Sequence, residues 1–352
     1  MKDLYLDNFY KLDLYGKSSK KLYNRGKSFG YQVLGFGSGV AAGFLPTQRG
    51  IFASGYDYTL DGDFSTYYGV SNLVNSSGVV AGDVSAVMTV AAQGEAAGYG
   101  GDKGIIGFGS DASSNINRSN LVNNVGTVAS DVTGVGTARR EQSAATYGGD
   151  KAIFALGHGN AGQTGVSNLV SNVGVVATDT SAVAGARASA YDTELGEIGT
   201  GSIAGFYCGY STAAGGDVTK KNIVSNVGII ASDANTSNIS QKNGGSGCRF
   251  GSTGQGIIAY GSDGASNILS ATGSASSVVS QVGNGAIGRA ACAYGEDKGI
   301  FAYGDPLPPE ASHLRWNTRN LVNNSGVIAS DAAGAGTVRS QPVACEYSTV
   351  AN

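Results

Sequence analysis

Histidine and cysteine are the residue types whose chemistry depends most on their spacing in this sequence. The chain holds two His, His158 and His313, in two separate loops. A Ser–His triad or a two-His metal site needs such residues beside particular partners, which the sequence does not offer. The cysteines form no CxxC pair, so zinc spacing is absent and we expect free, partly buried thiols at Cys208, Cys248, Cys292 and Cys345.

Three glycine-containing motifs match patterns of known sites. GHGNAG at 157–162 and GNGAIG at 283–288 fit the dinucleotide pattern GxGxxG, but neither is expected to open a helix, which the phosphate-binding mechanism requires. GKSFG at 26–30 fits the GxSxG pattern of hydrolases, yet charged residues precede it instead of an apolar strand. We interpret all three as coincidences in a glycine-rich chain.

Aspartates form the remaining group of chemistry-bearing side chains. Asp57, Asp61 and Asp63 could bring carboxylates to a hard cation such as Ca²⁺, but the spacing of an EF-hand is absent. A solvated loop is therefore the favoured interpretation. The sequence predicts a protein that is not an enzyme, with no catalytic, cofactor-binding or metal-binding residues.

The elements that position these residues must tolerate an unusual amount of glycine. Of the 352 residues, 57 are Gly. A mainly helical fold is excluded, because each helical Gly costs about 1 kcal/mol relative to Ala. With 41% hydrophobic and 14% charged residues, disorder is not expected. The net charge of −3 does not favour nucleic-acid binding, and no apolar run is long enough to span a membrane.

A repeat of roughly 50 residues determines the expected architecture. One element reads SNLVNSSGVVAGD from Ser71 and SNLVNNVGTVASD from Ser119, and a second, such as DKAIFALG ending at Gly157, precedes each copy. A unique active site would not recur in every repeat, so we interpret the recurring Asn and Asp as residues that fix turns. They are Asn72, Asn120, Asn168, Asn222, Asn267, Asn320, Asp83, Asp131, Asp179, Asp233 and Asp331.

Four short strands are expected in each repeat. A small-residue strand such as GEAAGYG (94–100) leads through a tight turn to a GIIGFG-type strand, and NLVNN and GTVASD follow. This layout predicts an all-β fold, a β-propeller of four-stranded blades, with seven blades favoured and six as the alternative. We expect the C-terminal strand in VRSQPVACEYSTVAN to close the ring, with N-terminal residues such as 28–37 completing its blade.

The order of these strands resembles the kelch repeat. Arg139, Arg187 and Arg339 precede three of the small strands, as an Arg often does in kelch blades, although the double Gly and the fourth-strand Trp of that family are missing. Segments such as YGGDKAIFALG are similar to Gly/Asn/Ser-rich propeller repeats of structural proteins of tailed bacteriophages. This resemblance implies a virion component: a tail, fibre, collar or decoration protein.

Binding is expected in the loops that interrupt the repeat. One of them holds the single Trp, Trp316, beside Arg315. An exposed pair of this kind could anchor an interface or stack on a glycan, and the alternative is a Trp that packs on its own blade. The longest interruptions are 56–70, 187–202, 234–253 and 305–318.

The first 37 residues lie outside the repeat and form a predicted N-terminal arm, followed by the propeller at 38–352. Basic and aromatic side chains alternate in this arm. Such a segment could bind nucleic acid, but docking to a partner protein is favoured, and closure of the propeller is the third alternative. The residues expected to bind the partner are Lys17, Lys20, Lys21, Tyr23 and Arg25, together with Arg315 and Trp316.

Two functions follow from these observations. The first is a non-enzymatic virion protein that contacts other virion proteins through its arm and loops. The alternative is a carbohydrate-binding propeller that recognises a host-surface glycan through Trp316 and the acidic loop from Asp57 to Asp63. Neither function requires a cofactor or a membrane.

Overall fold

The computed structural model describes residues 49–349, apart from 59–63, 87, 182, 197–200, 240–242, 263, 281 and 308–314. The described residues belong to the unit Phe44–Asn352, the second of the two into which the chain divides. They form strands, bridges and turns without any helix, which confirms the all-β prediction. A helix able to cross a membrane is accordingly absent from this part of the chain.

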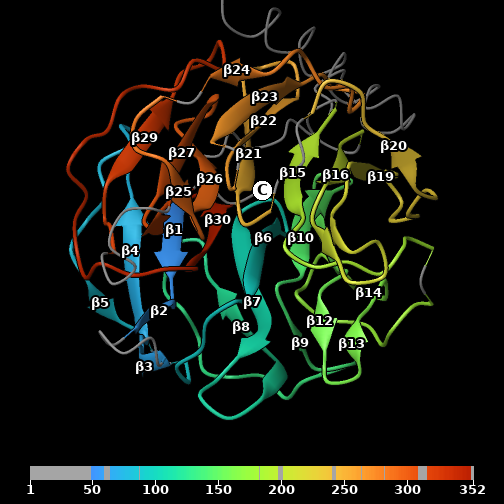
Figure 1. Cartoon of the computed structure of the whole chain (residues 1–352). Coiled ribbons are helices and arrows are strands. Elements are labelled where there is room, and N and C mark those ends of the chain that lie inside the picture. The colour runs from blue at the N-terminus through green and yellow to red at the C-terminus, as the bar shows by residue number, and fades with distance from the viewer. Residues whose placement is uncertain are drawn as a thin grey trace, which may run out of the picture. The chain divides into compact units, whose positions relative to one another are not determined.

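Six antiparallel sheets carry most of the described strands (Figure 1). In five of them, each strand pairs with the next strand of its own repeat. The core strands are, sheet by sheet, β6 (Glu95–Tyr99), β7 (Lys103–Ser110) and β8 (Asn115–Val122); β10 (Ser143–Tyr147), β11 (Lys151–Ala155) and β14 (Ser167–Val170); β15 (Tyr191–Leu195), β16 (Ile203–Tyr207) and β19 (Lys220–Val224); β21 (Ser246–Phe250), β22 (Gln255–Tyr260) and β23 (Ala265–Leu269); β26 (Ala290–Tyr294), β27 (Lys298–Ala302) and β29 (Arg319–Val322); and β30 (Val343–Tyr347), β1 (Arg49–Ala53) and β4 (Val70–Val74).

A short fourth segment lies along the outer edge of each sheet. In three sheets it is a two-residue strand, namely β5 (Val84–Ser85), β20 (Ala234–Asn235) and β24 (Val279–Ser280). In the others it makes only isolated bridges, such as Ser119 with Val132. The prediction of four short strands in each repeat is therefore confirmed for three sheets only, and there the fourth strand follows the predicted GTVASD-type segment, which itself makes only isolated bridges such as Val74 with Val80. Outer strands this short offer few unpaired backbone groups to another chain, which limits edge-to-edge aggregation.

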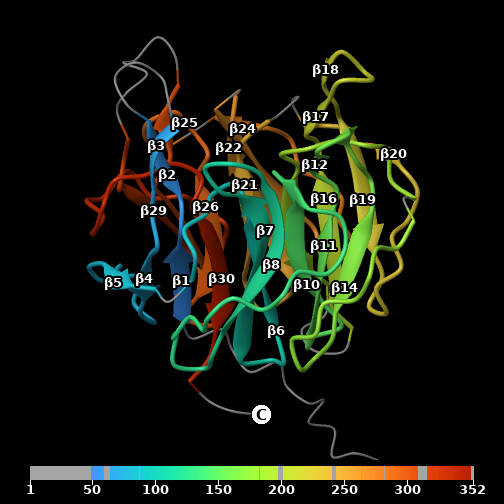
Figure 2. The same cartoon turned by 90° about the horizontal axis from the view of Figure 1, so that it is seen from below.

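The first strands of the six sheets contact one another in a closed order. β6 contacts β10, and the contacts continue through β15, β21, β26 and β30 back to β6. Figure 1 shows these strands around the middle of the described part, with the later strands of each sheet further out. Loops from the second to the third strand lie at one end of the sheets, where Figure 2 shows the hairpins β2–β3 (Tyr56–Tyr58, Phe64–Tyr67) and β17–β18 (Tyr210–Ser211, Gly216–Asp217).

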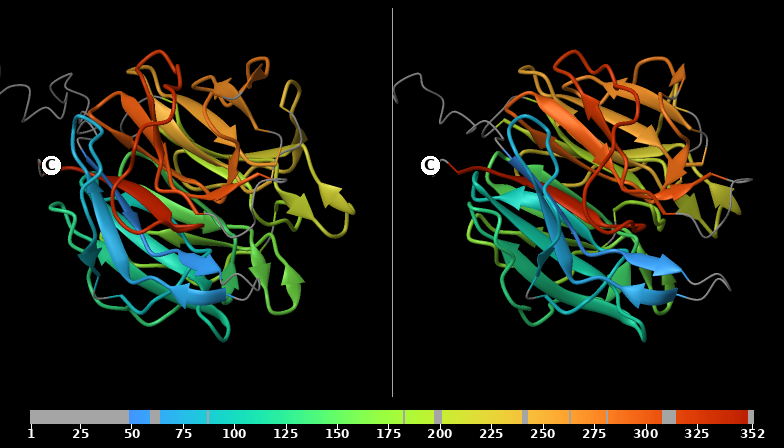
Figure 3. Two further views of the ribbon diagram at one scale, coloured as in Figure 1. Left: turned by 60° about the vertical axis from the view of Figure 1, so that its left-hand side comes forward. Right: turned by 90° about the vertical axis from the view of Figure 1, so that its left-hand side faces the viewer.

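The C-terminal strand completes the sheet that begins the described chain. β30 pairs with β1 in antiparallel register, from Arg49 opposite Tyr347 to Ala53 opposite Val343. Figure 3 shows the red β30 beside the blue β1. The C-terminal strand thus shares a sheet with the first described strand, because β1 occupies the place beside β30. The segment 28–37, which was expected to complete this sheet, lies outside the described residues.

Backbone hydrogen bonds link consecutive sheets just before their first strands. The Glu141 N–H donates to Gln93 O at 2.8 Å, and the Ser189 N–H donates to Glu141 O at 2.8 Å. The same contact recurs where Gly288 N–H reaches Gly244 O at 2.7 Å. These residues all have positive φ, which turns their amides towards the neighbouring sheet. The repeat therefore continues from sheet to sheet through the backbone itself.

In each of the six sheets, two residues with left-handed backbone conformation lie at the end of the second strand. Leu156 and Gly157 have φ values of 65° and 107°, and the corresponding pairs of the other five repeats behave alike. A methyl group on Gly157 would lie 2.8 Å from Arg140 O, so this position requires glycine for space as well as for conformation. The apolar-strand-then-Gly pattern of the sequence marks this turn in each repeat.

Side chains of neighbouring sheets interlock where a first strand meets the next sheet's second strand. A methyl group on Gly50 of β1 would lie 2.5 Å from Cys292 Sγ of β26. Cys345 faces Gly104 and Cys248 faces Gly299 in the same way. All four cysteines are free and buried, as the sequence predicted, and three of them fill the space that these glycines leave.

Candidate functional site

Buried arginines tie together the turns of individual repeats. Arg139 Nη2 donates to Asn168 Oδ1 at 2.7 Å, and Asn168 Nδ2 donates to Asp179 Oδ1 at 2.9 Å. Thr137 also donates to Asp179, from its hydroxyl at 2.6 Å. The same chain of bonds recurs in three other repeats, as Arg187–Asn222–Asp233, Arg289–Asn320–Asp331 and Arg339–Asn72–Asp83. The interpretation of the recurring Asn and Asp as turn-fixing residues is confirmed.

These bonds also stabilise the charged form of the aspartates. Burial alone would raise the pKa of Asp179, but the hydrogen bonds from Thr137 and Asn168 together outweigh it and lower the pKa. Conversely, burial lowers the pKa of Arg139 to about 10, although the Asp179 carboxylate opposes this change. Asp and Arg therefore remain ionised at neutral pH and serve the scaffold.

Carboxylates gather in a cavity enclosed by the first strands. Its lining includes Glu95, Asp192, Glu194 and Glu346, together with Arg249, among small residues. Asp192 and Glu194 alternate along β15, so both face the cavity. Arg249 Nε lies 3.7 Å from Glu194 Oε2, and each of these two side chains is 4% exposed.

One guanidinium faces four carboxylates in this cavity, and burial decides their protonation. Burial raises the pKa of Asp192 to about 8, against the hydrogen bond that it accepts from the Ala144 N–H at 2.7 Å. Burial also raises the pKa of Glu194 to about 7, although Arg249 lowers it, and it raises the pKa of Glu95 and Glu346. The group therefore holds protons near neutral pH.

The cavity is too small for an organic ligand. Its volume is about 40 Å³, which admits one or two water molecules. Pockets for small molecules usually measure at least about 300 Å³. The carboxylates can exchange protons with such water, but the enclosed space does not accommodate a substrate.

Sequence reasoning missed these carboxylates, although a signal was present. They interrupt strands in which Ala, Gly and Cys otherwise prevail, as in YDTEL (191–195) and VACEY (343–347). The available clue was strongest at Asp192, whose position is Ala or Gly in the five other first strands.

A larger, open cleft of about 470 Å³ lies where the loops of three consecutive repeats meet. Tyr67 of β3 forms one wall, the loop 110–115 a second, and Arg140 and His158–Asn160 a third. Its volume lies within the range usual for small-molecule sites. This cleft is the candidate functional site of the described residues.

The Asp111 loop is fixed by bonds to its own backbone. Asp111 Oδ1 accepts hydrogen bonds from the Ser113 N–H at 3.0 Å and the Ser114 N–H at 2.9 Å. The hydroxyl of Ser110 donates to Asp111 O at 3.0 Å. Burial tends to raise the pKa of Asp111, but the bonds from Ser113 and Ser114 and the charge of Arg118 lower it. The loop therefore presents a defined surface to the cleft.

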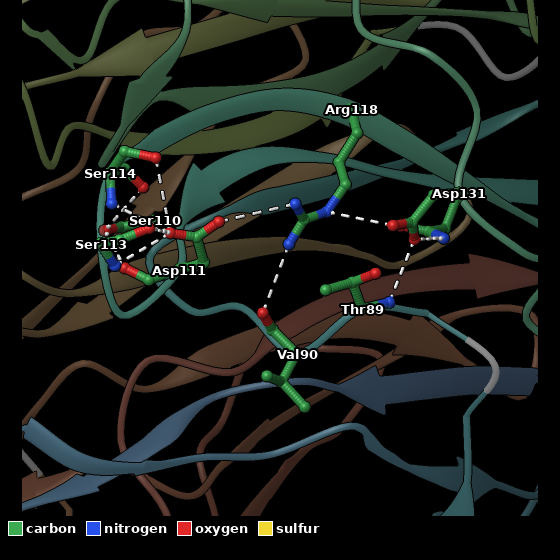
Figure 4. A network of polar contacts seen from close by, with 9 residues as sticks. Thr89, Val90, Ser110, Asp111, Ser113, Ser114, Arg118 and Asp131 are labelled. Carbon is green, nitrogen blue, oxygen red and sulfur yellow. Dashed lines mark hydrogen bonds and ion pairs between the residues drawn. The ribbon is translucent and has the colours of Figure 1, made fainter.

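Arg118 connects this loop to the scaffold. Its guanidinium lies between two carboxylates, with Nη1 3.7 Å from Asp111 Oδ2 and Nε 3.3 Å from Asp131 Oδ2, as Figure 4 shows. The same guanidinium donates to Val90 O at 3.3 Å, and Asp131 accepts the Thr89 N–H at 3.1 Å. The recurring Asp131 thus braces the wall of the cleft.

The opposite wall is held by an asparagine that joins two repeats. Asn115 Nδ2 donates to His158 O and to Asn160 Oδ1, both at 3.1 Å, and Asn115 Oδ1 accepts Arg140 Nη1 at 3.3 Å. Arg140 and His158 are directly opposite each other in neighbouring strands, β9 (Arg139–Arg140) and β12 (His158–Gly159). Opposite residues of a ladder point to the same face, so both side chains line the cleft.

The two loop residues predicted to bind a partner, Arg315 and Trp316, differ in their exposure. Arg315 is 6% exposed, and its Nε lies 2.9 Å from Asp305 Oδ1 and 3.7 Å from Asp57 Oδ1. Trp316 is partly exposed, and its backbone N–H donates to Gly304 O at 3.0 Å. Arg315 thus holds its loop, and a partner-binding role of the pair remains a prediction. Outside the described residues lie the motif at 26–30 and Lys17, Lys20, Lys21, Tyr23, Arg25, Asp61, Asp63 and His313.

The two GxGxxG segments do not open helices. Residues 158–159 of the first belong to β12, and residues 286–287 of the second form the strand β25 (Ala286–Ile287). The phosphate-binding mechanism of this motif needs the N-terminus of a helix, so their interpretation as coincidences is supported. No family model matches the chain, and no curated protein matches it.

Proposed function

We propose that the described sheets form a β-propeller of six blades. Three observations support it: the closed order of contacts among the first strands, the recurring backbone bonds between sheets, and the pairing of β30 with β1. Six blades, the alternative reading of the sequence, fit better than seven, because the C-terminal strand shares a sheet with β1 and does not begin another.

This propeller serves as a non-enzymatic protein-interaction module of a virus particle, in our proposal. The resemblance of the repeats to structural proteins of tailed bacteriophages supports the assignment to a virus particle. The observation that carries the interaction is a set of exposed apolar side chains beside the turn after the third strand, which we call the valine rim. Its members are Val79, Val125, Val173, Val227 and Val327, each at least 50% exposed.

The valine rim lies at one end of the sheets. All third strands run parallel to the first strands of their sheets, so the turns that follow them point the same way. A glycine with positive φ in each turn, such as Gly174, packs against Tyr99 and Leu121 of the preceding repeat, which leaves the adjacent valine outside. Grouped exposed apolar side chains of this kind mark protein–protein contact sites.

Co-sedimentation with virus particles that lack the endogenous protein tests this role. The full chain is expected to bind to the particles. The double variant Val173→Lys/Val227→Lys is expected to bind more weakly. A charge-reversal variant of Lys17, Lys20, Lys21 and Arg25 measures the part of the N-terminal arm. Val183→Lys, at a valine that is 56% exposed outside the rim, is the matched control. Failure of the folded full chain to sediment with particles would contradict the virion role.

A further inference from the structure

We propose that the cleft between Tyr67, Asp111, Asn115, Arg140, His158 and Asn160, hereafter the three-loop cleft, binds a neutral saccharide. This site is independent of the virion role, because it lies at the end of the sheets opposite the valine rim and uses different residues. It also differs from the loop of Trp316, where a glycan contact was expected from the sequence.

The lining supplies both donors and acceptors at short range from one another. Asn160 contributes its amide, Asn115 the second lone pair of its Oδ1, Ser113 and Ser114 hydroxyls, and Tyr67 a phenol. A saccharide hydroxyl both donates and accepts, so a lining with alternating donors and acceptors suits a ligand with several hydroxyl groups. No apolar side chain other than Ala112 and the Tyr67 ring lines the cleft among the described residues.

Tyr67 gives the cleft its aromatic wall. Its ring lies 6.2 Å from that of Tyr56, centroid to centroid, which holds it in place while part of it stays exposed. Burial raises the pKa of the Tyr67 phenol, against a hydrogen bond from Ser110, so the hydroxyl keeps its proton at neutral pH. An amphipathic ring of this kind contacts the apolar face of a sugar while its hydroxyl bonds the rim.

Histidine and arginine add polar atoms that the scaffold does not use. His158 Nδ1 is shielded from solvent and has no hydrogen-bond partner within the described part of the chain. The bonds of Arg140 engage its Nη1, with Asn115, and its Nε, 3.4 Å from Glu141 Oε1. A buried polar atom without a partner costs free energy, so a turn of the partly exposed imidazole that brings Nδ1 to a ligand in the cleft recovers it.

Charge compensation favours a neutral ligand over an anion. Arg140 is paired with Glu141, and Asp111 is paired with Arg118. A phosphate or nucleotide would meet a guanidinium whose charge Glu141 already compensates, whereas uncharged hydroxyl groups need only the amides, hydroxyls and ring nitrogen. The fixed Asp111 loop and the Asn115 bridge mean that little ordering is required on binding.

Saturation-transfer NMR on the full chain tests the proposal. The probes are glucose, galactose, mannose, xylose, N-acetylglucosamine, lactose and maltose, with inorganic phosphate and AMP as anionic comparators. At least one neutral sugar is expected to show saturable binding. Tyr67→Phe and His158→Ala are each expected to weaken it about 3- to 10-fold, the effect of one lost hydrogen bond.

A matched control distinguishes the cleft from the rest of the surface. Tyr210 follows the turn glycine in the next repeat, as His158 does here, and it lies outside the cleft with 38% of its surface exposed. Tyr210→Ala should leave the affinity unchanged, and thermal unfolding checks that every variant is folded. The proposal is overturned if no neutral sugar saturates, if only phosphate or AMP binds, or if the sugar binds equally well to both cleft variants. Particle co-sedimentation of the same variants should stay unchanged, so the virion role and this site can fail separately.

Discussion

A methyl group added to Gly104 is expected to collide with the sulfur of Cys345. Gly104 lies in β7 and Cys345 in β30 of the neighbouring sheet, and the added carbon would meet Cys345 Sγ well inside contact distance. The sulfur is 1% exposed and is packed in a buried apolar cluster, so it has little room to move away. Overpacking of such a site costs about 1–3 kcal/mol, and we expect Gly104→Ala to lower the free energy of unfolding by this amount.

Removing the sulfur should restore the fit. Cys345→Ala alone leaves a small void and is expected to cost about 1 kcal/mol. In the double variant the new methyl group fills that void. Two natural contacts already have this form, since Ala97 and Ala152 share one buried cluster and Ala145 and Ala204 share another. We therefore expect Gly104→Ala to cost little in the Cys345→Ala background.

Urea unfolding of the wild type, both single variants and the double variant measures the coupling. The expected interaction energy is at least about 1 kcal/mol in the stabilising direction, well above the ~0.5 kcal/mol scatter of independent sites. Additive single effects would refute the interlocking of sulfur and glycine between sheets. Gly299 faces Cys248 in the same way as Gly104 faces Cys345. The same set of single and double variants at Gly299 and Cys248 tests whether this packing of sulfur against glycine is general.

Three further predictions follow from buried polar groups. The folded-state pKa is raised to about 8 for Asp192 and to about 7 for Glu194, so the contribution of these groups to stability is fully present below pH ~4 and is lost as the pH rises to ~8. The free energy of unfolding should fall by about 1–3 kcal/mol over that range, which is less than full burial would give because the cavity admits water. Asp192→Asn should flatten this pH profile. Asn168→Ala should cost about 1–3 kcal/mol in chemical denaturation, because Arg139 Nη2 loses its acceptor and only the bond from Nη1 to Thr137 O remains. An unchanged midpoint would contradict the bracing role. The four cysteines should resist a thiol reagent in the folded protein and react together upon unfolding, because burial shields them. Burial also raises the thiol pKa of Cys248, Cys292 and Cys345. Rapid reaction of any thiol in the native state would contradict this prediction.

The strand layout could be predicted because its determinants are local. Branched runs such as KAIFALG, bounded by Gly and Asp, specify a short strand and its turn without information from elsewhere in the chain. The C-terminal segment could be predicted as a first strand too, because it repeats the small-residue pattern of the other first strands. The number of sheets was harder to predict, since it depends on which N-terminal residues share a sheet with that strand.

The candidate sites depend on contacts that no local pattern encodes. Asp192 and Glu194 reach the cavity because β15 presents its even-numbered side chains there, and a shift of one residue would have turned both into the packing between sheets. The three-loop cleft combines residues as far apart as Tyr67 and Asn160, and it exists only because three loops of different length meet. Neither arrangement recurs in the other repeats, so the repeat pattern could not reveal it.

Comparison of equivalent positions separates scaffold from function in this chain. The asparagine of the third strand recurs in all six sheets and bonds a carbonyl of the same repeat, as Asn168 does with Ala177 O at 2.9 Å. The fourth residue of the first strand, by contrast, is Glu in two sheets and Arg, Thr, Ala or Gly in the rest. A side chain that the architecture needs must be the same wherever the architecture repeats. The proposed saccharide site has the opposite character, because Tyr67 and His158 of the three-loop cleft do not recur in the other repeats.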